Sequence, residues 1–366
     1  MINKVAVLGA GNGGCAFSGH LAIKGFEVRL YEHPKFEKNI EEIRKRNGIE
    51  LVRKVEGFGK LSNVTTNIKD AIQGADVVMV VVPAYAQSII MEMALPYLEN
   101  GQIVVFNPDN YGSLRFMKMV KDKGIKKKFR VAGTASLLYA CRKSSPSKVD
   151  ITAVKSTMPV GVLTAADTEY ILKSLKEMFS EFTLASNILE VDFGNVNMIL
   201  HCPTAVLNAG RIESTKGNFE FYWEGMTESV CRVMEEMDKE KIKVGEKLGL
   251  ELASTLESMR QFYSSEKEGK DLHDFLVNSR VHGGHGANAP KDLKHRYLSE
   301  DVPYGLCAVS SFGKLVNVPT PTIDSIIQLS SIMNGEDYMK SGMTIEKMGL
   351  SDKTHEEMMK YIIEGK

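Results

Sequence analysis

A cluster of glycines between an apolar run and an amphipathic stretch constrains this chain more than any other feature. Val5–Leu8 is an apolar run of the kind that parallel sheets bury on both faces, and Gly9, Gly11 and Gly14 follow it as G-x-G-x-x-G. The first glycine permits a tight turn, the second lets the backbone approach a pyrophosphate, and the third lets a helix over 13–24 pack closely. We therefore expect a dinucleotide-binding loop; a plain strand, turn and helix is the alternative.

The end of the second expected strand, over 27–31, indicates which dinucleotide binds. Glu32 follows this strand at about the distance expected for the acid that accepts hydrogen bonds from the adenosine ribose. A carboxylate there repels a 2′-phosphate, so we expect NAD, with NADP as the alternative because Arg29, His33 and Lys35 lie close by.

Apolar strand-like runs then alternate with helical patterns. The runs over 76–84, 102–108 and 128–133 are separated by helical patterns over about 84–98 and 112–123. This rhythm predicts a doubly wound parallel sheet whose ligand lies at the carboxyl ends of the strands. The residues expected to contact the cofactor are Gly9, Ala10, Gly11, Asn12, Gly13, Gly14, Glu32, Pro83 and Ala84.

The character of the sequence changes near residue 188. Strand-like alternation over 148–159 and a helix over about 164–179 precede the change, and helical patterns, such as the charged stretch over 234–249, dominate after it. We expect an α/β Rossmann domain over 1–187 followed by an all-α domain over 188–366. Because no Gly/Ser-rich or Pro-rich linker separates the two, direct packing is expected.

Composition excludes several classes of partner. The 46 basic and 46 acidic residues balance, so the overall charge recruits neither nucleic acid nor an anionic membrane. The five cysteines contain no C-x-x-C pair, and the chain has neither a signal-like start nor a run of about 18 apolar residues. We expect a cytoplasmic protein without disulfides, and a homodimer.

The chemistry is expected in the stretch over 190–213. On a helical wheel, polar side chains form one stripe and apolar ones cover much of the remainder, and Pro203 is expected to break the helix locally. A buried helix must present such a stripe to something polar: either a reaction site or ordinary core hydrogen bonds. The stripe consists of Asn197, His201, Thr204 and Asn208.

Three motifs in the same order give the chain a family resemblance. GAGNGG at 9–14, NVNMILHCPTAVLNAGRIE at 195–213 and HRYLSEDVPYGL at 295–306 together resemble the octopine/nopaline-type opine dehydrogenases. That family joins a Rossmann domain to a helical domain like that of the 6-phosphogluconate dehydrogenase group. One departure is Gly133, at which many members have an acid.

The resemblance implies an NAD(P)-dependent oxidoreductase that acts on CH–NH bonds and condenses an amino acid with a 2-oxo acid. It implies a catalytic pair of His201 and Asp301, and a substrate carboxylate bound by Arg296. Asn208 and Asn197 are the further substrate-binding candidates. The residue types suit these roles, since histidine titrates near neutrality and a guanidinium binds carboxylates in a bidentate fashion.

The same residues are compatible with other functions. A ketopantoate-reductase-like enzyme or a 2-hydroxyacid dehydrogenase could use the same scaffold, and a dinucleotide-binding protein without catalysis would need the glycine loop but not the histidine. The segment over 280–291 contains two histidines in a glycine-rich loop, but no third ligand has suitable spacing. We expect no metal site.

Overall fold

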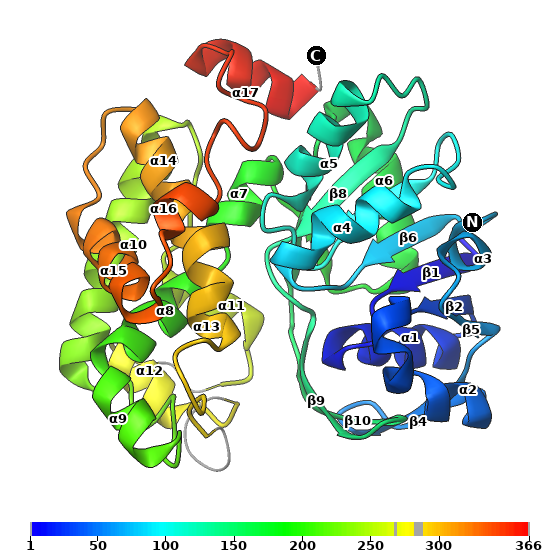
Figure 1. Ribbon diagram of the computed structural model, residues 1–366, viewed down its shortest axis with the longest axis horizontal. Coiled ribbons are helices and arrows are strands. Elements are labelled where there is room, and N and C mark those ends of the chain that lie inside the picture. Colours follow the sequence, from blue (N-terminus) through cyan, green and yellow to red (C-terminus); the bar gives the residue numbers. More distant parts are fainter. Residues whose placement is uncertain (1, 267–268, 282–287, 365–366) are drawn as a thin grey trace. The chain divides into compact units, whose positions relative to one another are not determined.

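The computed structural model describes residues 2–266, 269–281 and 288–364. The chain forms two compact units, the first from residues 1–191 with 360–366 and the second from residues 192–359 (Figure 1). The second unit therefore begins at Asp192, a little after the change in pattern at residue 188.

The first unit is built on an eight-stranded sheet in the order β12-β11-β8-β7-β6-β1-β2-β5. Neighbouring strands are parallel except β8 and β11, which are antiparallel. The strands are β1 (Lys4–Leu8), β2 (Glu27–Tyr31), β5 (Asn63–Thr65), β6 (Val77–Val80), β7 (Ile103–Phe106), β8 (Arg130–Thr134), β11 (Met158–Val162) and β12 (Phe182–Leu184). The predicted doubly wound sheet is confirmed.

Helices follow the strands as the sequence predicted. Pro83 is the N-cap of α4, which begins at Ala84, shortly after β6 ends at Val80. The helices of this unit are α1 (Asn12–Ile23), η1 (Pro34–Asn39), α2 (Glu41–Arg46), α3 (Ile68–Ile72), α4 (Ala84–Ala94), α5 (Gly112–Asp122), η2 (Ala165–Asp167), α6 (Thr168–Met178) and α7 (Ile188–Phe193), whose last two residues group with the second unit.

A second, four-stranded sheet was not predicted. Its order is β4-β3-β10-β9, from β4 (Gly57–Lys60), β3 (Gly48–Arg53), β10 (Lys148–Val154) and β9 (Tyr139–Ser145). The alternation over 148–159 thus covers two strands, β10 and β11, that belong to different sheets. Strand β4 packs closely on α1, because a Cβ on Gly59 would lie 2.2 Å from the carbonyl oxygen of Gly19.

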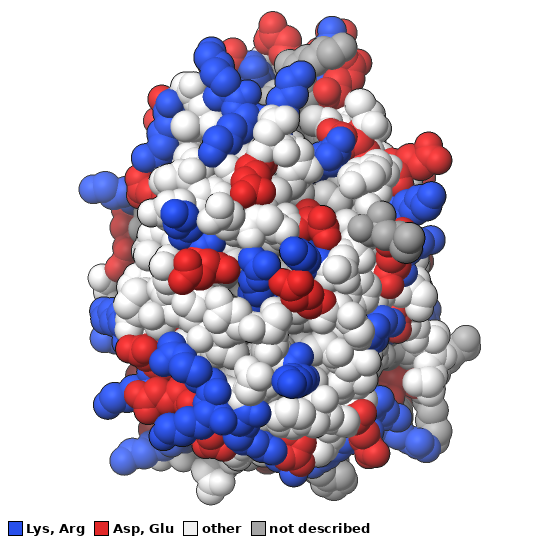
Figure 2. Space-filling model, turned by 90° about the vertical axis from the view of Figure 1, so that its right-hand side faces the viewer, with Lys and Arg blue, Asp and Glu red and all other residues white. Residues whose placement is uncertain are grey.

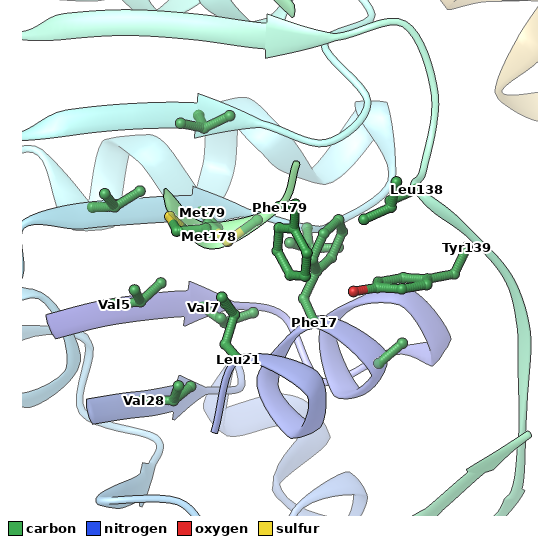
Figure 3. Packing of buried hydrophobic residues seen from close by; sticks show 14 of the residues in the cluster. Val5, Val7, Phe17, Leu21, Val28, Met79, Leu138, Tyr139, Met178 and Phe179 are labelled. Carbon is green, nitrogen blue, oxygen red and sulfur yellow. The ribbon is translucent and has the colours of Figure 1, made fainter. Parts of the chain in front are cut away.

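The core of the first unit lies between α1 and the large sheet (Figure 3). Phe17 and Leu21 of α1 meet strand residues such as Val7, and the rings of Phe17 and Phe179 pack edge to face with centroids 5.6 Å apart. All four side chains are fully buried. Burial of each large apolar side chain contributes about 1.5–3 kcal/mol, so this packing fixes the helix that begins in the glycine loop.

The second unit consists of helices around α8, which contacts α10, α13, α15 and η3. The helices are α8 (Asn197–Leu207), α9 (Ala209–Thr215), α10 (Glu228–Lys247), α11 (Thr255–Phe262), α12 (Leu272–Asn278), α13 (Arg296–Ser299), η3 (Val302–Leu306), α14 (Cys307–Leu315), α15 (Pro321–Asn334), α16 (Tyr338–Ser341) and α17 (His355–Glu364), the last residues of which group with the first unit.

Two expectations for the stretch over 190–213 are wrong. It forms three helices, α7, α8 and α9, rather than one, and α8 continues through Pro203 instead of breaking there. Proline removes only one backbone donor, the one that would bond the carbonyl of Ile199, so the other hydrogen bonds of the helix can still form on either side of it. The helix therefore tolerates the proline.

Charges of both signs are mixed on the surface. Figure 2 shows Lys and Arg next to Asp and Glu in many places on the face that it displays. None of the helices in the described part of the chain is long and apolar enough to cross a membrane.

Candidate functional site

The glycine loop lies between β1 and α1. Gly9 has φ +113°, and a Cβ there would lie 2.5 Å from the carbonyl oxygen of Val81 at the end of the neighbouring strand. A Cβ on Gly14 would lie 1.8 Å from the carbonyl oxygen of Gly9. These two glycines are therefore required by the fold itself, as the sequence pattern indicated for the turn and for the helix packing.

Gly11 differs from its two neighbours in the motif. It is the N-cap of α1 with ordinary φ of −73°, and a Cβ built on it would meet nothing within 4 Å. The space beside this exposed glycine adjoins the first backbone N–H groups of α1, which can receive an anion. The loop thus fits the pyrophosphate of a dinucleotide.

Glu32 lies beside this loop and is buried. Its Oε2 accepts hydrogen bonds from the backbone N–H of Ala10 at 3.3 Å and from Nδ2 of Asn39 at 3.1 Å, and its Oε1 accepts from the N–H of His33 at 2.8 Å. The carboxylate therefore joins the end of β2 to the loop. Asn39 was not anticipated, because nothing in its surroundings in sequence marks it.

Strand β9 of the small sheet also reaches the loop. The backbone N–H of Lys143 donates to Oδ1 of Asn12 at 2.9 Å, and its Nζ lies 3.4 Å from the carbonyl oxygens of both Ala10 and Asn39. Lys143 is 131 residues from Asn12 in sequence. No local sequence pattern marks this cation, because the small sheet that positions it was not predicted.

The other expected cofactor residues, Pro83 and Ala84, lie where β6 gives way to α4. Two nitrogens of Arg115 lie 3.2 Å from the carbonyl oxygen of Ala84, and one of them lies 3.0 Å from the Ser88 hydroxyl. This arginine from α5 fixes the first turn of α4 beside the strand end.

The departure at Gly133 has a steric explanation. A Cβ on Gly133 would lie 2.4 Å from the Cβ of Asp109, which follows the neighbouring strand β7. The Asp109 carboxylate is fully buried and accepts hydrogen bonds from the N–H and hydroxyl of Ser113 at 3.0 and 2.7 Å. An acid thus lies next to this position, but it belongs to the adjacent strand's loop.

In the second unit, α8 brings His201 to Asp301. Both side chains are buried, and Nδ1 of His201 lies 2.7 Å from Oδ2 of Asp301. The two residues are 100 positions apart in sequence. A carboxylate only accepts, so with Asp301 ionised the Nδ1–H donates and Nε2 carries the lone pair of the neutral ring. This arrangement suits a histidine that exchanges a proton at Nε2.

Close packing of helices makes this contact. Asp301 directly precedes η3, a π-helical turn of the type often found at functional sites. A Cβ on Gly305 in that turn would lie 2.8 Å from Cβ of Met198, so glycine lets η3 approach α8. The Cys202 thiol also lies 3.4 Å from the carbonyl oxygen of Tyr297 on α13.

Aromatic side chains enclose the histidine. The ring of Tyr297 stacks on His201 with centroids 3.9 Å apart, and the hydroxyl of Tyr222 lies 2.8 Å from Nε2. Burial raises the pKa of Tyr222 well above its usual value, so its hydroxyl stays protonated at neutral pH. Tyr222 was missed, since an aromatic run such as FYW at 221–223 is also typical of a core segment.

The expected substrate-binding residues lie on α8, which carries His201, and on α13, which ends shortly before Asp301. Arg296 begins α13, with a half-exposed side chain whose Nε lies 2.9 Å from Oε2 of the buried Glu300. Asn208 ends α8 and donates from Nδ2 to the carbonyls of Thr204 and Gly225, both at 2.9 Å. Asn197 is the first residue of α8 and is half-buried.

No group of metal ligands occurs within residues 2–266, 269–281 and 288–364. The two histidines of the glycine-rich loop, His282 and His285, lie outside the described residues. All five cysteines are free.

Comparison with protein families gives two matches along the chain. Residues 184–334 match the NAD/NADP octopine/nopaline dehydrogenase alpha-helical domain, and residues 4–128 match the N-terminus of NAD-dependent glycerol-3-phosphate dehydrogenase.

Whole-chain relatives agree with these matches. An opine dehydrogenase of an Arthrobacter strain is 33% identical over 353 residues, which cover 95% of this chain and 96% of the relative. An octopine dehydrogenase solved with NADH and L-arginine superposes with a TM-score of 0.76 at 20% identity, covering 100% of this chain and 98% of the other. A yersinopine dehydrogenase solved with NADP⁺ gives 0.70 at 13% identity, covering 98% and 99%.

Proposed function

The chain belongs to the opine dehydrogenase family, and on that premise we propose that His201 exchanges the proton of its reaction while Asp301 orients it. Members are NAD-dependent oxidoreductases that act on CH–NH donors, and this chain is one of them. The observation that carries the assignment of roles is the buried 2.7 Å contact between Nδ1 of His201 and Oδ2 of Asp301.

The substrates we propose are an amino acid and a 2-oxo acid. Condensation of the amine with the carbonyl group expels water and leaves a C=N bond. When bound, the nicotinamide cofactor supplies the hydride that reduces this carbon. The nitrogen then holds one proton more than in the imine, and Nε2 of His201 is the proposed donor; in the oxidative direction the same atom accepts that proton.

Asp301 and Tyr222 keep the imidazole ready for this exchange. The Asp301 carboxylate stabilises the protonated ring and holds Nδ1–H, which leaves Nε2 as the reacting atom. The Tyr222 hydroxyl can donate to Nε2 in the neutral ring and accept from it in the charged ring. We propose that Tyr222 is a positioning residue. Its hydrogen bond to Nε2 of His201 is replaced by one to the substrate nitrogen when the substrate binds.

Arg296 is the proposed ligand of a substrate carboxylate. Its half-exposed side chain lies on α13, the helix that also carries Tyr297 against the His201 ring. The ion pair with Glu300 involves Nε. A planar guanidinium matches a carboxylate better than an ammonium does. Asn197 and Asn208 are proposed to contribute polar contacts from the two ends of α8.

A matrix of substrates tests the reaction class. Pyruvate, 2-oxoglutarate and oxaloacetate are each combined with a panel of amino acids, and NADH oxidation is followed. We expect consumption of NADH only when an amine accompanies the oxo acid, with the secondary amine product detected by mass spectrometry. Oxidation with an oxo acid alone would instead indicate a 2-hydroxyacid dehydrogenase. Binding of NADH without turnover of any pair would favour a non-catalytic dinucleotide-binding protein.

A further inference from the structure

The ring of Tyr297 contacts two histidines. It stacks on the ring of His201 with centroids 3.9 Å apart and planes 23° apart, and it meets the ring of His295 at 4.4 Å and 79°. His201 is buried, Tyr297 is half-buried and His295 is exposed. Tyr297 therefore covers one face of the buried imidazole. Proton exchange at Nε2 does not by itself require an aromatic ring there.

One hydrogen bond leaves the plane of an imidazole free to tilt. The 2.7 Å contact between Nδ1 of His201 and Oδ2 of Asp301 holds only one edge of the ring. The second side-chain torsion of histidine has broad minima, so the opposite edge, with Nε2, can move at small cost. The bond from Tyr222 does not prevent this, because it is given up when the substrate binds. A ring stacked on the imidazole face opposes the tilt, since the tilt sacrifices the stacking contact.

Tyr297 is itself held against α8. Its carbonyl oxygen accepts from the thiol of Cys202 at 3.4 Å, and Cys202 directly follows His201. The ring of Phe221, which is fully buried, lies 4.8 Å from the Tyr297 ring. The helix that carries Tyr297, α13, also packs on α8. The tyrosine ring therefore has a defined position relative to the histidine.

The hydroxyl of Tyr297 has a different neighbour from its ring. It hydrogen-bonds the hydroxyl of Tyr222, and together with burial, the larger cause, Tyr297 raises the pKa of Tyr222. The hydroxyl thus reaches His201 only through Tyr222, whereas the ring touches the imidazole directly. An aromatic face also attracts a cation, so the stack persists when His201 is protonated. The ring is therefore the part of Tyr297 that stays on the imidazole throughout the proton exchange.

We propose that Tyr297 is a positioning residue of the reaction, whose ring holds the His201 imidazole in the plane that directs Nε2 at the substrate nitrogen. The proposal rests on the proposed role of His201 in proton exchange. Asp301 fixes the tautomer and one edge of the imidazole, and Tyr297 fixes its plane. The ring is therefore needed for turnover, and the hydroxyl is dispensable.

Substitutions at position 297 in the full-length protein separate the ring from the hydroxyl. Tyr297→Phe keeps the ring, whereas Tyr297→Leu and Tyr297→Met replace it with an apolar chain. We expect kcat within about 2-fold of the wild type for the first variant and about 10-fold lower for the other two, the upper range for one aromatic contact. The dissociation constant of NADH should change by less than about 2-fold in all three. Tyr297→Leu should cause no further loss in the His201→Ala background, because it acts through that imidazole.

Phe312→Leu is the matched control, because this buried ring of the same unit meets Phe193 at 5.5 Å rather than a histidine. It should lower the urea midpoint and leave kcat unchanged. A Phe variant as slow as the Leu variant would assign the effect to the hydroxyl and overturn the proposal. Normal turnover without the ring, additive losses with His201→Ala, or unfolding of both the Leu and Met variants would also overturn it. If His201→Ala itself kept a normal kcat, the proposed role of His201 would fail instead.

Discussion

The glycine loop and the histidine pair bring their functional groups together differently: the loop from consecutive residues, and the pair from residues far apart in sequence. The loop is six consecutive residues, and its tightest contact, between the positions of Gly14 and Gly9, lies within the motif. The pair joins residues 100 positions apart, and it depends on the close approach of η3 to α8 at Gly305. A local site is therefore sensitive to single backbone positions, whereas an assembled site depends on the packing of a whole unit.

The largest expected effect separates chemistry from nucleotide binding. His201→Ala should lower kcat by about 10²-fold to 10⁴-fold, the usual contribution of a general acid or base, while the dissociation constant of NADH stays nearly unchanged. Asp301→Asn should cause a related loss, because an amide cannot stabilise the charged ring. The double variant should be little worse than the worse single variant, since the two residues act as a unit. Steady-state kinetics and NADH titration provide both readouts.

His355→Ala is the control for the histidine substitution, because His355 is exposed. It should leave kcat unchanged. A normal kcat for the His201→Ala variant would show that the histidine pair does not carry out the proton transfer.

The next largest effects are expected at two glycines of the loop. Substitution of Gly11 should mainly weaken NADH binding, and substitution of Gly14 should mainly destabilise the fold. Gly11→Val should weaken NADH binding about 10-fold to 100-fold, the equivalent of the 1–3 kcal/mol that an intruding side chain costs, and should lower the urea midpoint less than Gly14→Ala does, because valine is only a poorer N-cap than glycine. Gly14→Ala should instead lower the free energy of unfolding by about 2 kcal/mol or more, because its Cβ would lie 1.8 Å from the carbonyl oxygen of Gly9. Urea titrations and NADH fluorescence separate the two; equal destabilisation by both substitutions would contradict this division.

The smallest effect concerns Tyr222. Tyr222→Phe should lower kcat by about 10-fold or less, the value of one positioning hydrogen bond, and should add nothing in the His201→Ala background, because it acts through that ring. A double-mutant cycle measures this coupling. Tyr338→Phe is the matched control, since that hydroxyl bonds Asn334 at 2.8 Å rather than a histidine. Additive losses would indicate that Tyr222 merely supports the fold.

Local patterns predicted much of the first unit. Strand β2 occupies 27–31 as predicted, and α4 begins at Ala84 after the proline that ends the apolar run. Both depend on short-range rules, the alternation of side chains along a strand and the restriction of backbone geometry by proline. The family resemblance identified His201 and Asp301 as a pair before any geometry was known.

What was missed depends on contacts between distant segments. The small sheet pairs β3 with β10, about a hundred residues later, so no local pattern marks its strands as partners. Lys143 consequently has no signal in sequence. Tyr222 differs, because its aromatic neighbourhood is equally typical of a core segment, and only its distance to Nε2 of His201 reveals a polar role.

The empty surroundings of Gly11 have an evolutionary consequence. Gly9 and Gly14 are needed for the chain to fold, whereas a side chain at position 11 would meet nothing in the protein within 4 Å. Purifying selection on position 11 therefore comes chiefly from the ligand. In a descendant that kept the fold but abandoned the reaction, position 11 should drift first, so substitutions there would identify lineages that have lost the enzyme while retaining its architecture.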